Sequence, residues 1–183
     1  MNKVTVRASS ALAQALSAGG NADYDAALKQ ADADYKTASN KCGGRKGNDK
    51  DVCKAEAKRD RDVAKANADA SRDGTAKAQA KAHKVKADRD YDVAKEMCGD
   101  DRKGIDKDVC LKEAKVGHKK ALGAARVEKA ASTGTSTDVA EARREAKKDT
   151  LDAKYRADRE KCDAMSGDAK DKCTADVKAK YGK

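Results

Sequence analysis

The spacing of six cysteines constrains the fold of this 183-residue chain more than any other feature. They form three pairs separated by 11, 12 and 11 residues: Cys42/Cys53, Cys98/Cys110 and Cys162/Cys173. A tyrosine lies seven residues before each first cysteine, and a glycine lies six residues before each second cysteine: Tyr35, Tyr91 and Tyr155, and Gly47, Gly104 and Gly167. One unit therefore occurs three times, which indicates a fold built from repeated modules.

Composition favours helices over other structure. Alanine supplies 38 residues, whereas Leu, Ile, Val and Phe together supply 18, and Pro and Trp are absent. β-Sandwiches and barrels need many β-branched and aromatic residues, and a compact α/β enzyme needs a larger apolar core. Ala, Lys, Arg, Glu and Gln are strong helix formers, so the chain is expected to be all-α.

The spacing of apolar residues places each cysteine on a helix. Before the first cysteine, one face repeats at intervals of four and three residues: Tyr24, Leu28, Ala31, Tyr35, Ala38 and Cys42. After Cys110, small residues predict an inward stripe at Ala114, Gly117, Ala121 and Ala124. Because both intervals match the helical period, we expect six helices. Their predicted ranges are 22–42, 49–72, 75–98, 106–131, 138–162 and 168–181.

The predicted fold is a tandem of three helical hairpins, each stapled by a local disulfide. The first hairpin covers residues 22–73, the second 74–131 and the third 132–183. Breaks are expected at Gly74 and in the linker 131–137, where Asp138 with Glu141 resembles a helix-starting capping box. Residues 1–21 are expected to be leader-like or disordered: Met1-Asn2-Lys3 is a basic start, and Ala11-Leu12-Ala13 has the form of a cleavage site.

The repeat also predicts the cysteine pairing. Six cysteines allow 15 connectivities, but only the local one keeps every pair inside its own unit. Each bridge closes a loop of about 12 residues, worth about 3 kcal/mol in the loop-entropy model. Structural disulfides persist in oxidising compartments, so the chain is expected to be periplasmic or secreted.

Other chemistry has weaker support in the sequence. Zinc sites prefer cysteines two to four residues apart, and the two histidines, His83 and His118, do not recur with the repeat. A thiol metal carrier therefore stays only as a third hypothesis. We find no catalytic or cofactor-binding motif and expect no enzyme, no cofactor and no resident metal. The sequence contains no stretch of about 20 apolar residues, so no transmembrane helix is expected.

The net charge of +10 is the main indication of a partner. It attracts polyanions such as nucleic acid or an anionic envelope polymer. Acidic residues are interspersed with the basic ones, however, as in Arg59-Asp60-Arg61-Asp62, and such mixing is typical of solvated helix faces. Thin alanine-faced helices also leave self-association open.

Two stretches carry a resemblance to a known group. ADYDAALKQADADYK, followed by KC and KDVCKAEAK, spans residues 22–58, and YRADREKCDAMSGDAKDKCTADVKAKYGK ends the chain. Both resemble Ala/Lys/Asp-rich exported bacterial proteins with paired cysteines, which are uncharacterised and loosely described as cell-envelope or TolA-like. The resemblance implies periplasmic helical hairpins and supplies no catalytic residue.

These observations lead to two main hypotheses of function. The first is a non-enzymatic extracytoplasmic helical repeat protein that acts as a binding or spacer protein, or in envelope stress. The second is a basic protein that binds a polyanion.

Overall fold

The computed structural model describes residues 10–99 and 102–183, and this part of the chain folds into helices without strands. The helices are α1 (Ser10–Cys42), α2 (Gly47–Asp73), α3 (Ala76–Met97), α4 (Ile105–Thr133), α5 (Ser136–Cys162) and α6 (Gly167–Tyr181). The predicted all-α fold of three disulfide-stapled hairpins is confirmed.

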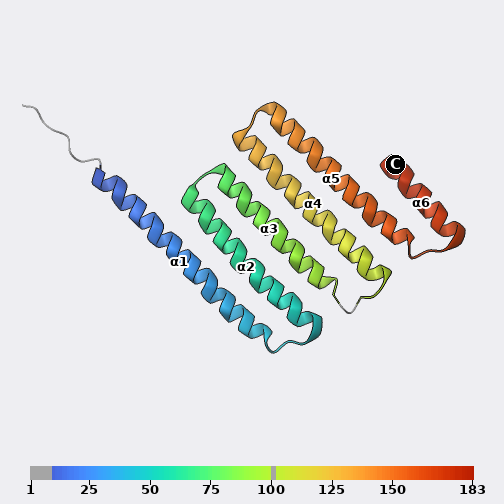
Figure 1. The fold of residues 1–183 in the computed structure, drawn as a ribbon, viewed down its shortest axis with the longest axis horizontal. Helices are drawn as coiled ribbons and strands as arrows, with labels where there is room; N and C mark the ends of the chain where they lie inside the picture. The colour runs from blue at the N-terminus through green and yellow to red at the C-terminus, as the bar shows by residue number, and fades with distance from the viewer. Residues whose placement is uncertain (1–9, 100–101) are drawn as a thin grey trace, which may run out of the picture.

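The helices lie side by side in a single antiparallel layer (Figure 1). Within the described residues, each helix packs only against its neighbours in sequence. The loops that follow α1, α3 and α5 lie along one edge, here called the disulfide edge, and the turns that follow α2 and α4 lie along the opposite edge. Both broad faces of the layer are therefore open to solvent over most of their area.

No helix in the described ranges is both long and apolar enough to cross a membrane.

The helix ends agree with the predicted ranges to within two residues, with one exception. Helix α1 begins at Ser10 rather than at residue 22. Residues 10–21 of the segment expected to be leader-like or disordered are thus helical, while residues 1–9 lie outside the described part of the chain. Whether residues 1–21 act as a leader stays a prediction.

The expected linker at residues 131–137 is a tight turn. Helix α4 runs to Thr133 and α5 begins at Ser136, which leaves only Gly134 and Thr135 between them. The N-cap is Thr135, whose side chain accepts a hydrogen bond from the backbone N–H of Asp138, while the Asp138 carboxylate accepts from the Thr135 N–H. A capping box is therefore present, but its N-cap is Thr135 and not, as predicted, Asp138, which is instead the N3 residue.

The repeated glycine has a conformational role that explains its recurrence. Gly47, Gly104 and Gly167 lie at the starts of α2, α4 and α6 with φ of +51°, +54° and +55°. An L-residue with a side chain rarely adopts this left-handed backbone. In each hairpin the glycine leads into the second helix.

Small residues line the contacts between neighbouring helices. The buried hydrophobic residues are alanines, cysteines and a single valine, Val93, and the largest fully buried side chains are Cys42, Cys98 and Cys162. The predicted inward face of α1 is confirmed, because each of its six residues is buried or half-buried. No polar or charged residue is fully buried in the described chain.

The predicted inward stripe on α4 is wrong in part. Gly117, Ala121 and Ala124 are exposed, and α4 instead buries Gly123 and Ala125. The reason is that α4 contacts α3 on one side and α5 on the other, so its stripe lies on an open face between the two contacts. Leu151 of α5 also lies on an open face and is 41% exposed.

The closest approach of α4 to α5 depends on a glycine. A methyl group added at Gly123 would lie 2.7 Å from the Cβ of Ala146. Real Cβ atoms do not approach so closely, so any larger residue would push the two helices apart. The short distance between α4 and α5 at this point, where the second and third hairpins meet, therefore requires glycine at position 123.

Two glycine substitutions on α4 should have opposite effects on stability. Gly123→Ala should lower the free energy of unfolding, because overpacking costs about 1–3 kcal/mol and exceeds the gain in helix propensity. Gly117→Ala, at an exposed position with no atom within 4 Å of the added methyl group, should raise it by about 1 kcal/mol. Urea unfolding of both variants checks this, and stabilisation by Gly123→Ala would contradict the packing described.

Candidate functional site: the disulfide edge and the α4–α5 groove

All six cysteines are paired as the sequence predicts. The Cα–Cα distances are 5.7 Å for Cys42–Cys53, 5.6 Å for Cys98–Cys110 and 5.7 Å for Cys162–Cys173. Each bridge joins the two helices of one hairpin near its loop, so the three lie along the disulfide edge (Figure 1). No cysteine is left as a thiol in this oxidised form.

The repeated tyrosines pack within their hairpins. The Arg61 guanidinium of α2 lies 4.3 Å from the ring centroid of Tyr35. Tyr91 of α3 stacks on His118 of α4 at 4.5 Å, and Tyr155 of α5 meets the C-terminal Tyr181 edge-on at 5.8 Å. Each tyrosine thus helps to hold the two helices of a hairpin together, two helical turns from the disulfide.

Both histidines pair with carboxylates across the α3–α4 hairpin. His83 Nδ1 lies 2.6 Å from Glu128, and His118 Nε2 lies 2.7 Å from Asp88. Because a carboxylate only accepts, the Nε2–H of His118 donates to Asp88, and the buried Nδ1 of the same ring has no hydrogen-bond partner. The pKa of Asp88 is held below its ordinary value by hydrogen bonds from Lys84 and His118, despite partial burial. The histidines therefore have structural partners.

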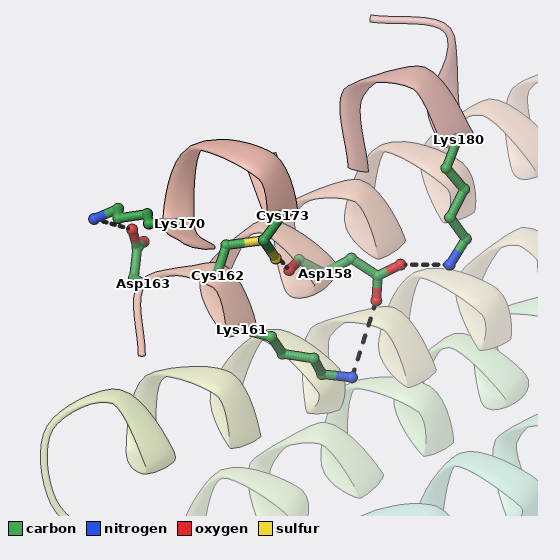
Figure 2. Close-up of a disulfide and its surroundings, with 7 residues drawn as sticks. All are labelled: Asp158, Lys161, Cys162, Asp163, Lys170, Cys173 and Lys180. Carbon is green, nitrogen blue, oxygen red and sulfur yellow. Dashed lines mark hydrogen bonds and ion pairs between the residues drawn. A yellow bond between two sulfur atoms is a disulfide. The ribbon is translucent and has the colours of Figure 1, made fainter. Parts of the chain in front are cut away.

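Helix α6 depends strongly on its disulfide. Helix α6 has 15 residues, and none of them is buried. It is much shorter than its partner α5, which has 27 residues. Near the Cys162–Cys173 bridge, Asp158 accepts a hydrogen bond of 2.8 Å from Lys180 (Figure 2). It accepts a second hydrogen bond, also of 2.8 Å, from the Tyr181 hydroxyl. The hydrogen bond from Lys180 is the main cause that lowers the pKa of Asp158, with Tyr181 adding to it. One bridge and one carboxylate thus hold most of α6 against α5.

A groove that was not predicted from the sequence lies between α4 and α5 on one open face of the layer. It has a volume of about 580 Å³. Its floor is apolar or small: Gly123, Ala124, Val127, Ala146, Thr150 and Leu151. Four exposed cations line it: Lys120, Arg143, Lys147 and Lys154. We call this feature the α4–α5 groove.

The α4–α5 groove gathers four cations in one hollow. Among the residues that the structure describes, none of the four forms an ion pair with a carboxylate. The one acid at the groove, Glu128, is already paired with His83. The groove therefore presents positive charge that the protein itself does not neutralise.

Other hollows in the described layer carry their own counter-ions. The one between α4, α5 and α6 contains Lys161 paired with Glu113 and Lys180 paired with Asp158. Another, near the turn between α2 and α3, has a volume of about 640 Å³ and contains three lysines that are unpaired within the described chain, Lys77, Lys81 and Lys129. Two carboxylates, Asp69 and Asp73, also line it and are paired with Arg72, so it gathers fewer unpaired cations and more acids than the α4–α5 groove. The α4–α5 groove is thus the better candidate for a site that takes an anion.

The described residues form no cluster of three or more His, Cys, Asp or Glu side chains able to hold a metal ion.

Loss of the third disulfide should release α6 selectively. Replacing Cys162 and Cys173 by alanine removes about 3 kcal/mol of loop-entropy stabilisation from a helix that buries no residue. We expect amide hydrogen exchange to rise in α6 while α2 to α4 stay protected. The matched control replaces Cys42 and Cys53 by alanine and should leave α6 protected; equal exchange of α6 in both variants would contradict the local role.

The docking of α6 should also be sensitive to acid. Since the folded pKa of Asp158 lies below its ordinary value of about 4, its contribution is present above that pH and is lost as pH falls through the folded pKa. Asp158→Asn should raise exchange in α6 at neutral pH and remove the acid-dependent step. Asp176→Asn, at an exposed carboxylate of α6, is the control, and an equal effect of both changes would refute this role.

Comparison with known proteins finds no matching family model, no matching curated protein and no matching solved structure. The resemblance to exported, cell-envelope or TolA-like bacterial proteins therefore stays a prediction, and the function must be argued from the surface of the layer.

Proposed function

We propose that this chain is a non-enzymatic, extracytoplasmic binding protein that holds an anionic partner in the α4–α5 groove. The observation that carries the proposal is the group of four unpaired cations around an apolar floor. An exposed cation without a counter-ion gains more from an incoming anion than one that must first give up a carboxylate.

The periplasm or the cell exterior suits this role. Three structural disulfides persist where the environment is oxidising. In a reducing compartment the protein would lose its largest fully buried contacts, which are made by cysteines. The envelope and its anionic components are thus the expected setting of the partner.

A spacer role is the second candidate. The single layer of long helices is stiffened at one edge by three covalent bridges and has both faces open (Figure 1). A protein that only separates other molecules needs no defined groove, so loss of the groove cations would leave this role intact. That difference distinguishes the two candidates.

Binding of model polyanions should depend on the groove and on salt. The oxidised full chain is titrated with fluorescent poly-L-glutamate and with polyphosphate at about 50 to 200 mM salt. With Arg143→Gln and Lys147→Gln together, affinity should fall at least about tenfold and the salt dependence should become shallower by about two counter-ions. This result requires the two cations to contact the anion directly.

The matched control removes the same charge elsewhere. Lys29 and Lys36 are exposed on α1 and lie far from the groove. Lys29→Gln with Lys36→Gln should change affinity by less than about twofold. Equal losses in both double variants would show that only net charge matters, and no binding of either polyanion would discard the anionic partner and leave the spacer role.

A further inference from the structure

The two walls of the α4–α5 groove have different chemistry. Three of the four cations, Arg143, Lys147 and Lys154, belong to α5. Helix α4 contributes small residues, Val127, one cation, Lys120, and one carboxylate, Glu128, which is paired with His83. Ala124 lies on the groove floor and is exposed, and Ala121 and Gly117 continue the same open face of α4. A bound molecule would therefore contact small apolar side chains of α4 on one side and positively charged side chains of α5 on the other.

The cations of α5 are spaced to face a helix. Arg143, Lys147 and Lys154 are separated by four and then seven residues, so they lie on one side of α5. They extend over about 16 Å, or about three helical turns. A second helix running along the groove repeats at the same pitch, so acidic residues spaced by four and seven would meet these cations in register.

We propose that the occupant of the α4–α5 groove is an acidic amphipathic helix of a partner protein. This inference rests on the anion-binding function proposed above and names the chemistry of its ligand. The apolar stripe of the helix lies on Ala124, Val127 and Leu151, and its acidic flank faces Arg143 and Lys147. Small residues on α4 allow the two backbones to approach closely, as helix packing against a groove requires.

A uniformly charged polymer fits these observations less well. It would reach the cations but would leave the apolar floor in water, including Leu151, which is 41% exposed. An amphipathic helix covers the floor and the charge together. Its binding should therefore depend on the floor as well as on the cations, whereas polymer binding should depend on the cations alone.

The test uses two synthetic peptides of equal composition. One, of about 18 residues, places leucine and alanine on one stripe with glutamates beside it, and is long enough to form a helix when bound. The other has the same residues in an order without a stripe. The oxidised full chain should bind the first peptide at least about tenfold more tightly than the second, and binding should raise the helical circular dichroism signal.

The substitution Ala124→Lys should change the affinities for a helical ligand and for a polymer in opposite directions. Ala124→Lys adds bulk to the floor and also adds positive charge at an exposed helical position, so the fold should tolerate it. It should weaken binding of the amphipathic peptide at least about tenfold and strengthen binding of polyphosphate. Ala121→Lys, on the same face of α4 but outside the residues that line the groove, controls for the added charge.

The outcomes distinguish failure of this inference from failure of the proposed function. If both peptides bind equally and Ala124→Lys tightens both, the helical occupant is wrong, but an anion-binding groove stands. If polyphosphate alone binds in a manner that depends on Arg143 and Lys147, the ligand is a polymer. If neither peptide nor polymer depends on those cations, both proposals fall.

Discussion

The three disulfides provide stability that side-chain packing alone does not provide in this fold. Neighbouring helices meet through alanine, and the largest fully buried side chains in the described chain are cysteines. Burying a methyl group yields little against an ordering cost of about 1.5 kcal/mol per residue. Each bridge adds about 3 kcal/mol by limiting the unfolded chain. The bridges therefore allow helices with few bulky residues to form stable hairpins.

The same scarcity of large side chains accounts for the single layer. A second layer needs an apolar face to cover, whereas here each helix packs only against its neighbours in sequence within the described chain. Stability then depends on contacts between adjacent helices, as in repeat proteins. The last helix follows this logic most clearly, since α6 buries no residue and relies on Cys162–Cys173 and Asp158.

Local features were predictable from the sequence, and features that join distant segments were not. The helices and the pairing follow from periodicity and from repetition, which act over a few turns. The exposed stripe at Gly117, Ala121 and Ala124 was misassigned because alanine and glycine suit a helix contact and an open face equally well. The cations Arg143, Lys147 and Lys154 share a face of the predicted helix 138–162, but only the structure sets that face beside the small residues of α4.

The position of the α4–α5 groove gives a ligand an influence on the fold. Helices α4 and α5 belong to different hairpins, and no disulfide joins them. Their contact depends on Gly123 against Ala146 and on a short turn capped by Thr135. A ligand that contacts both helices stabilises this junction increasingly as its concentration exceeds its Kd, because it binds only when the helices are adjacent. The groove thus lies at one of the two junctions between hairpins, where side-chain packing and ion pairs hold the helices together without a disulfide.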